Sequence, residues 1–440
     1  MIPLLVTDAL EIFFLILTAV MIAYLVRHYI FTITVLRSAN KKKQLPSSMD
    51  LTFEPTVSIL VPAFNEEKVI GRLLSRITTF TYPKDKLQVI VINDASNDQT
   101  GKIADDYKNK YPYINVLHRD RSNGRRGKAS AMNHGFSKCT GEIVLCFDAD
   151  YYPQRDIVET LVKEFVDPHV GAVQGRVVVL NEPQNIVTRL VALERIGGYR
   201  VDQEARDKLG LIAQFGGTVG GFRNSVLKNL SGWDESVLAE DTDLTFRVYL
   251  EGYKIRYSVD AECYEEAVDN WKSYWRQRYR WAKGHMQCFF KHFWGVLKSK
   301  NLTVKEKIDG LMLLSVYFMP ILALFSLIVG LILIFSSPAQ LTSSTSLEIP
   351  DIVLWSTIPI SLYSFVGNFA PFFEVGVGLY LDGRSRTQWL IPLLLFTFFF
   401  NIPLCLKAFF DVITSKSSGR NNNVWVKTTH SGKGNCNIEN

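Results

Sequence analysis

The sequence has few cysteines, no CxxC pair and no cluster of histidine and cysteine at metal-ligand spacing. Six scattered cysteines in a chain of 440 residues are typical of buried thiols in a reducing compartment, so they disfavour a disulfide framework and a structural zinc site. The net charge of +6 is also small. Because the basic residues gather at the edges of apolar segments, we predict that the partners include a lipid bilayer and no nucleic acid.

No lysine or arginine precedes the first apolar run, which extends from about Ala9 to Ile30. The run is long enough to span a bilayer. A cleaved signal peptide would need a positive segment before the run and a small-residue cleavage site after it, and the sequence has neither. Instead, Arg27 lies near the end of the run, and Arg37 and lysines 41–43 follow it. The positive-inside rule therefore predicts a transmembrane helix over residues 1–36 and a cytoplasmic domain after it.

Three more apolar runs follow near the C-terminus, at Leu311–Phe335, Ile352–Leu381 and Trp389–Phe410. The first would form about 37 Å of helix at 1.5 Å per residue, enough to cross a hydrocarbon core of about 30 Å. Four full spans that begin outside would end outside, whereas the basic tail over residues 414–440 favours the cytoplasmic side. We therefore predict a multi-pass protein of the cell membrane. About three transmembrane segments lie within residues 308–413, and one of the last segments could be re-entrant or interfacial.

The middle of the chain alternates short apolar runs with segments of helical spacing. Repeated strand–helix units of this kind predict an α/β fold with a parallel, doubly wound sheet. The predicted strands are Val57–Val61, Gln88–Asn93, Ile114–Leu117 and Ile143–Phe147, and the predicted helices are Glu66–Phe80, Gln99–Tyr111 and Gly127–Lys138.

Three of these strands end in a polar or acidic cluster, at Asn65-Glu66, Asn93-Asp94 and Asp148-Ala149-Asp150. Ligands of open parallel sheets bind beyond the carboxyl ends of the strands, so the clusters predict one site at this edge. Two carboxylates at one strand exit suit Mg²⁺ or Mn²⁺, with the remaining ligands from a nucleotide diphosphate. Such a metal would neutralise charge on the leaving group. The alternative is a solvated acidic turn, because DxD is a common tripeptide.

Asp94 could accept hydrogen bonds from a base or ribose, or it could cap the following helix. Asp98 is the better candidate for the cap, which would leave Asp94 free for a ligand. Lys128 follows two arginines and Gly127 at the start of a small-residue helix. A helix start with a lysine suits a phosphate, although a solvated basic loop explains the residues equally well.

Glu240 and Asp241 open an amphipathic helix, where one carboxylate could take the proton from an acceptor hydroxyl. The alternative is an acidic pair that is favoured at the helix start by the helix dipole. Residues 266–300 are amphipathic, aromatic and basic, which predicts helices that lie in a membrane interface. Within them, the motif Gln277–Trp281 combines an indole face for a sugar ring with arginine forks for a diphosphate.

The segment from about Pro55 to His292 resembles the family-2 glycosyltransferases. It looks like the processive, membrane-bound branch that includes cellulose, chitin, hyaluronan and poly-N-acetylglucosamine synthases. The similarity covers more than half of the chain and rests on the order of the motifs, which are PAFNE, Asp94, GKASAMN, Asp148-Ala149-Asp150, FGGT, Glu240-Asp241 and QRYRW. The resemblance implies a GT-A-type domain with a Rossmann-like, mainly parallel sheet over residues 50–265.

The family also implies roles for individual residues. Asp241 would be the catalytic base, and Asp148 and Asp150 would bind the metal. The nucleotide sugar would contact Ala63, Asn65, Glu66, Asp94, Lys128, Asp148, Gln277 and Arg280, and the acceptor would contact Gly217, Thr218, Glu240 and Trp281. One departure is Ala239, which replaces the first, non-catalytic residue of the usual TED or GED triplet.

The resemblance implies an inverting, metal-dependent hexosyltransferase that extends a β-linked polysaccharide from a UDP-sugar. UDP-N-acetylglucosamine is the expected donor, and proteins that export or modify the polymer are candidate partners. A non-processive enzyme that makes short oligosaccharides or uses a lipid-linked acceptor stays open, although many such relatives lack QxxRW. An inactive channel or sensor would be expected to lack Asp150, Asp241 or Arg280, and all three are present.

Overall fold

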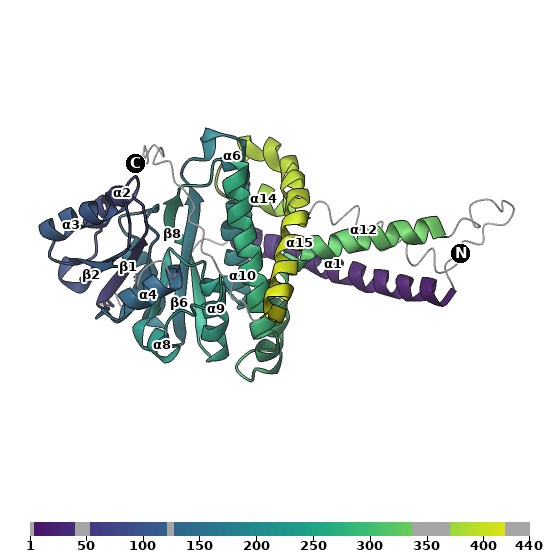
Figure 1. The fold of residues 1–440 in the computed structure, drawn as a ribbon, viewed down its shortest axis with the longest axis horizontal. Helices are drawn as coiled ribbons and strands as arrows, with labels where there is room; N and C mark the ends of the chain where they lie inside the picture. The colour runs from purple at the N-terminus through teal and green to yellow at the C-terminus, as the bar shows by residue number, and fades with distance from the viewer. Residues whose placement is uncertain (1–3, 40–52, 121–126, 337–369, 419–440) are drawn as a thin grey trace.

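The structure is a computed structural model that describes residues 4–39, 53–120, 127–336 and 370–418. Its centre is an eight-stranded sheet with the order β3-β2-β1-β4-β7-β6-β8-β5 (Figure 1). The strands are β1 (Val57–Ala63), β2 (Leu87–Asp94), β3 (Ile114–Arg119), β4 (Ile143–Cys146), β5 (Tyr152–Pro153), β6 (Val170–Val179), β7 (Gly220–Arg223) and β8 (Lys254–Glu265).

The first four strands pair in parallel, as the sequence predicts. The other half of the sheet is mixed, because β7 runs antiparallel to both of its neighbours and β5 runs antiparallel to β8. β7 begins with two glycines, and a Cβ on Gly221 would lie 2.1 Å from the carbonyl oxygen of Val144. The close approach of the flanking strands therefore requires glycine, which explains why β7 has no apolar run to reveal it.

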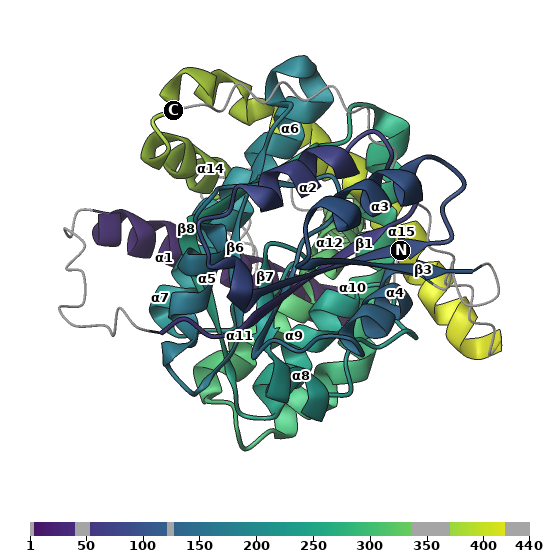
Figure 2. The ribbon, with the colours of Figure 1, turned by 90° about the vertical axis from the view of Figure 1, so that its left-hand side faces the viewer.

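Helices cover both faces of the sheet, so β1, β2 and β4 are buried on both sides (Figure 2). One face packs against α2 (Ile70–Thr78), α3 (Thr100–Lys110) and α5 (Ile157–Val162). The opposite face packs against α4 (Lys128–Phe136), α8 (Asn224–Asn229) and α9 (Glu240–Leu250). This arrangement confirms the predicted α/β fold and brings the carboxyl ends of the strands to one edge.

After β6 the chain forms a continuous helical layer before it returns to the sheet. It consists of α6 (Ile186–Arg195), the π-helical segment η4 (Ile196–Gln203) and α7 (Glu204–Leu209). Asn185 caps α6 by accepting hydrogen bonds from the amides of Val187 and Thr188. The layer ends at Gly210 in the left-handed conformation, a common helix stop.

The amphipathic segment after β8 forms one long helix, α10 (Trp271–Lys298), which is capped by the side chain of Asn270. It is followed by α11 (Val304–Leu314) and α12 (Met319–Ser336). The prediction of an unbroken span over Leu311–Phe335 is wrong, because α11 ends at Leu314 and the turn Val316–Phe318 separates the two helices. Pro320 has no N–H to donate to the preceding turn, so a new helix begins beside it.

Three described helices are long and apolar enough to cross a membrane, over Asp8–Ala39, Val316–Leu333 and Ser385–Ser415. α1 (Leu4–Ala39) lies beside α12, and the two project together from the sheet domain (Figure 1). α15 (Leu394–Ser418) instead runs along α10. Of the predicted run Ile352–Leu381, residues 352–369 lie outside the described ranges, and the described part forms the 12-residue helix α14 (Ala370–Leu381).

Candidate active site

A cleft of about 440 Å³ opens at the carboxyl edge of the strands. It is bounded by the ends of β1, β2 and β4, the starts of α4 and α9, the η4 segment, and one face of α10. Most of the residues singled out in the sequence line this cleft: Ala63, Glu66, Asp94, Lys128, Asp148, Asp150, Thr218, Glu240, Asp241, Gln277, Arg280 and Trp281. The fold therefore gathers residues that are more than 200 positions apart in the sequence.

Asn65 is predicted to contact the nucleotide sugar, yet it is not among the residues that line the cleft. Its backbone has a φ of 54°, a conformation that asparagine tolerates better than most residues. Its amide donates to Ser96 at 2.9 Å, and its side-chain oxygen accepts from the amide of Asn97 at 2.7 Å. Asn65 thus fixes the loop after β1 to the loop after β2.

Asp94 lies in the cleft, as a contact with a nucleotide sugar requires, but it also has a partner within the protein. Asp94 is 5% exposed and forms an ion pair with Arg119 at 2.8 Å. The two residues are directly opposite in the parallel pair of β2 and β3, so the sheet register creates this contact. Asp98 does accept from the amide of Thr100 at the start of α3, as predicted. Asp94 lines the cleft with one of its oxygens held by an arginine.

Lys128 begins α4 immediately after Gly127, which has a φ of 103°. Its ammonium pairs with Asp148 at 2.5 Å and donates to the carbonyl oxygen of Gly217 at 3.0 Å. Burial disfavours the lysine charge, but the carboxylates of Asp148 and Glu240 outweigh burial and raise the pKa of Lys128. The lysine is therefore a fixed positive charge inside an acidic cleft.

The carboxylates of Asp148 and Asp150 both line the cleft beyond β4. The described residues contain no group of three or more histidine, cysteine or acidic side chains arranged to hold a metal. The protein therefore offers two carboxylates rather than a complete cage. Mg²⁺ commonly binds one or two carboxylates and takes its other ligands from water and phosphates, so this donor set fits a hard cation that is shared with a diphosphate.

Asp241 lies in the first turn of α9, and one of its oxygens accepts from the amide of Thr242 at 2.7 Å. Its other oxygen approaches Gly217, where a Cβ would be only 3.0 Å away. Gly217 has a φ of 85°, so glycine is needed for both the backbone conformation and the space. Burial, followed by the neighbouring charge of Asp241, raises the pKa of Glu240 to about 7. The acidic pair also occupies a helix start, where the dipole favours it.

The α10 helix presents Gln277, Arg280 and Trp281 to the cleft. The indole of Trp281 lies near two guanidiniums, with Arg278 at 4.3 Å and Arg195 at 5.1 Å from its ring centroid. Within the described part of the chain, Arg280 makes no ion pair or hydrogen bond. Its guanidinium is therefore available for an anionic ligand.

Several residues that line the cleft belong to none of the sequence motifs. They include Arg195, Tyr199, Asp202, Gln203, Gln214, Glu265 and His285. His285 is four residues after Trp281 on one helix, and Gln214 directly precedes the FGGT motif, so helical spacing and motif proximity could have found these two. Arg195 and Asp202 belong to the helical layer after β6, where no motif marks them.

Residues 55–284 match the family model described as "Glycosyltransferase like family 2". The chain belongs to glycosyltransferase family 2. It is 40% identical over 248 residues to "Probable glycosyltransferase YdaM" of Bacillus subtilis, a match that covers 56% of this chain and 59% of that protein.

Two other groups of curated relatives make different products, according to their names. The chain is 32% identical over 279 residues to a β-monoglucosyldiacylglycerol synthase of Synechocystis, covering 63% of this chain and 57% of that protein. It is 28% identical over 249 residues to a poly-β-1,6-N-acetyl-D-glucosamine synthase of Staphylococcus epidermidis, covering 56% and 59%. The matches thus span about six tenths of the length of these relatives.

Among solved structures, the mannosyltransferase PcManGT of Pyrobaculum calidifontis, in complex with GDP-Man and Mn²⁺, is similar with a TM-score of 0.57. The alignment covers 86% of this chain and 99% of that one, at 23% sequence identity. This likeness supports the GT-A-like fold, including the helices beyond the sheet domain.

Proposed function

We propose that the protein is a membrane-bound, inverting transferase that moves a sugar from a UDP-sugar to a growing β-linked polysaccharide. The observation that carries this proposal is the convergence of Asp148 and Asp150, Asp241, and Arg280 in one cleft of a family-2 transferase. UDP-N-acetylglucosamine is the donor we expect, in keeping with the poly-N-acetylglucosamine synthases among the relatives.

Each charged group in the cleft has a task in a one-step displacement. Asp241 would accept the proton of the attacking hydroxyl, which increases its nucleophilicity. Arg280 and Lys128 would bind the diphosphate and stabilise the negative charge that develops on it. Asp148 and Asp150 would hold Mg²⁺ or Mn²⁺ together with the diphosphate, and the metal would neutralise charge on the leaving group.

The aromatic and glycine positions would orient the acceptor. The indole of Trp281 lies in the cleft near two arginines, and its open surface could stack on an acceptor sugar. Gly217 leaves room for the carboxylate of Asp241, so the acceptor hydroxyl could approach the base beside Thr218. Inversion at the anomeric carbon follows from attack on the face opposite the departing diphosphate.

A second candidate function is transfer to a lipid. The β-monoglucosyldiacylglycerol synthases match at 32% identity, above the 28% of the polysaccharide synthases. The cleft also reaches Tyr317, in the turn that joins α11 to the apolar helix α12. An acceptor anchored in the bilayer could therefore enter from the membrane side.

The enzyme would be anchored in the membrane by its apolar helices. Exposed apolar side chains cover α1 and α12, which suits contact with lipid tails. The basic residues that follow α1 favour a transferase domain in the cytoplasm, where nucleotide sugars are made. The protein would thus be a multi-pass protein of the cell membrane.

Product analysis tests both functions with the purified full-length chain in lipid nanodiscs. We would supply radiolabelled UDP-N-acetylglucosamine, UDP-glucose or GDP-mannose with Mg²⁺ or Mn²⁺, with and without diacylglycerol. A labelled product of high molecular weight supports the polysaccharide function. Product found only in the chloroform phase and dependent on diacylglycerol would replace it with the glycolipid function.

An Asp241→Asn variant separates chemistry from binding in the same assay. We expect turnover to fall by roughly 100-fold or more, because the amide cannot accept the proton. Binding of UDP should be retained. Full turnover by this variant would refute the assignment of Asp241 as the base.

A further inference from the structure

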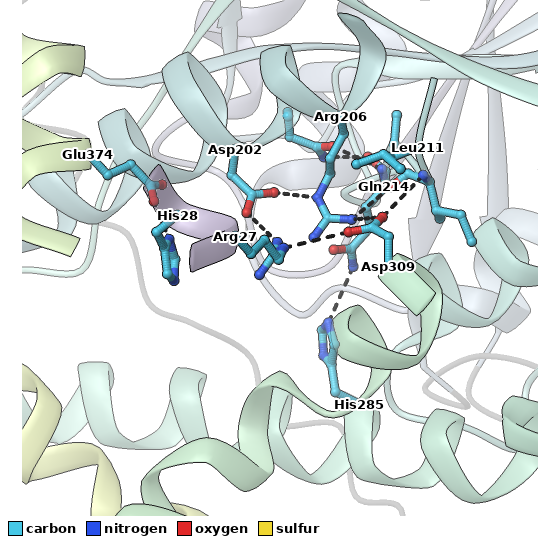
Figure 3. Close-up of polar contacts among 12 residues, drawn as sticks. Arg27, His28, Asp202, Arg206, Leu211, Gln214, His285, Asp309 and Glu374 are labelled. Atoms are coloured by element: carbon cyan, nitrogen blue, oxygen red, sulfur yellow. Dashed lines mark hydrogen bonds and ion pairs between the residues drawn. The ribbon is translucent and has the colours of Figure 1, made fainter. Parts of the chain in front are cut away.

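A buried cluster of four charged residues joins the N-terminal helix to the wall of the cleft (Figure 3). Arg27 of α1 pairs with Asp202 of η4 at 2.6 Å and faces Asp309 of α11 at 3.5 Å. Arg206 of α7 pairs with the same two acids, each at 2.5 Å. Arg27 is 8% exposed and Arg206 is 1% exposed. Two positive and two negative charges balance, which is the condition under which buried ions are tolerated.

One member of this cluster faces the cleft. Asp202 lines the cleft beside Gln203, while its carboxylate is held from behind by Arg27 and Arg206. Burial alone would raise the pKa of Asp202, but the two guanidiniums outweigh burial and hold that pKa below its usual value. Arg27 therefore supports a charged group in the wall of the active site from within an apolar membrane helix.

The cluster also fixes the segment that leads to the FGGT motif. Arg206 donates to the carbonyl oxygen of Ile212 at 3.1 Å, and the amide of Ile212 donates to Asp309 at 3.2 Å. The side chain of Gln203 forms two hydrogen bonds with the backbone of Gln214, at 2.6 and 2.9 Å. These hydrogen bonds hold the backbone of residues 211–214 in place on the side that faces the charged cluster.

Gln214 of this segment also contacts α9, the helix that begins with Glu240 and Asp241. The side-chain amide of Gln214 donates to the hydroxyl of Thr242 at 2.9 Å and lies 3.2 Å from Nε2 of His285. Nδ1 of His285 is within 3.0 Å of the carbonyl oxygen of Trp281, and burial lowers the pKa of this histidine. A neutral ring that donates to Trp281 through Nδ1 can accept from Gln214 at Nε2. The amide of Thr242 in turn donates to Asp241.

We propose that Arg27 is a positioning residue of the active site, so that the first membrane helix forms part of the catalytic structure as well as the anchor. Arg27 acts through Asp202 and Asp309 on residues 211–214, and through Gln214 on the start of α9. The inference rests on the proposed role of Asp241 as the base. Loss of Arg27 would leave one buried acid in excess and loosen the acceptor side of the cleft. The diphosphate side, formed by Lys128 and Arg280, does not contact the cluster.

Arg27→Met tests this role in the full-length chain in nanodiscs, because methionine keeps an apolar stem and removes the charge. We expect kcat to fall by roughly 10- to 100-fold, as a misplacement of about 1 Å is enough for such a loss. The dissociation constant for UDP should stay within about twofold of the original protein, because the interactions lost are not those that bind the donor. Arg27→Lys should recover most of the activity. Arg37→Met, on the exposed part of the same helix, is the matched control.

A double variant separates positioning from stability. Arg27→Met combined with Asp202→Asn restores the balance of buried charge, so it should recover the thermal stability of the chain but not kcat. Recovery of kcat together with stability would overturn the proposal, as would an equal loss of UDP binding and turnover in Arg27→Met, or no loss at all.

Hydrogen exchange tests the same link without turnover, so it stands apart from the assignment of the base. In Arg27→Met, we expect faster exchange in residues 211–218 and in the first turn of α9 than in the Arg37→Met control, because local opening becomes less costly. Unchanged exchange in those peptides would also overturn the proposal. Failure of Asp241→Asn to lower activity, with exchange altered as expected, would instead refute only the proposed base.

Discussion

Replacement of Gly217 by alanine would test the geometry of the base directly. The Cβ of alanine would lie 3.0 Å from Oδ2 and 3.4 Å from Cβ of Asp241. Gly217 also has a φ of 85°, a conformation that residues with a side chain rarely adopt. The substitution therefore combines backbone strain with a collision against the carboxylate proposed as the base.

The two effects have different sizes and different readouts. Placing an L-residue in the left-handed region costs about 1–2 kcal/mol of folding stability. The collision forces Asp241 or residue 217 to move by a few tenths of an ångström, and misplacement on the scale of 1 Å can lower turnover by about 100-fold. We therefore expect Gly217→Ala to lower kcat by at least roughly tenfold, with a modest loss of stability.

Gly383→Ala is the matched control, because Gly383 has a φ of 68° and a Cβ there would meet nothing within 4 Å. It should lose similar stability and keep its turnover. Turnover and thermal unfolding of both variants would be measured in the same nanodiscs. Equal kcat values for Gly217→Ala and the original protein would refute the argument that Gly217 sets the position of Asp241.

Three further outcomes follow from the charges near the cleft. In the absence of ligand and metal, the pKa of Glu240 is about 7 in the folded chain, against 4.5 for the free side chain. The contribution of Glu240 to stability is therefore greatest below pH 4.5 and is lost as the pH rises through 7. Glu240→Gln should remove that decline in thermal unfolding scans. Burial raises the pKa of Asp243, but the hydrogen bond from His292 and the nearby cations lower it overall, so its contribution to stability is present above pH 3.8 and is lost in acid. Asp243→Asn should cost about 3–5 kcal/mol in denaturant unfolding at pH 7, because it removes the charged partner of the buried His292 and of Arg247. Chelation with EDTA should abolish turnover but leave the melting temperature without substrate nearly unchanged. The reason is that Asp148 and Asp150 form only part of a metal site when no diphosphate is bound. A large shift in melting temperature on chelation would contradict this account of the metal site.

A strand or helix can be predicted from the sequence when its own residues show the pattern of apolar positions that is typical of that element. β1 and β2 are continuous apolar runs that are buried on both faces, so their positions follow from the sequence. β7 has no such run, because a Cβ at its glycines would collide with the backbones of β4 and β6. A strand whose composition is set by its neighbours cannot be recognised before those neighbours are placed.

The same limit applies to the site. Asp148 and Asp241 belong to motifs whose order along the chain is informative, and the structure brings both to the cleft. The pairing of Asp94 with Arg119 depends on the register between β2 and β3, which nothing near Asp94 encodes. Arg27 lies still farther from its partners, 175 residues before Asp202. Ion pairs between distant segments require the fold, because either residue alone is compatible with many environments.

The position of α15 indicates on which side of the membrane the C-terminal part of the chain lies. α15 packs along α10 through a shared apolar cluster and through the hydroxyl of Tyr279, which donates to Asp411. α10 lines the cleft with Gln277 and Arg280, so we expect it to lie at the membrane surface on the side of the transferase domain, and α15 packs along it. We therefore infer that α15 is interfacial despite its apolar composition. The basic residues of the tail over residues 414–440 agree with an end of α15 on the same side of the membrane as the transferase domain.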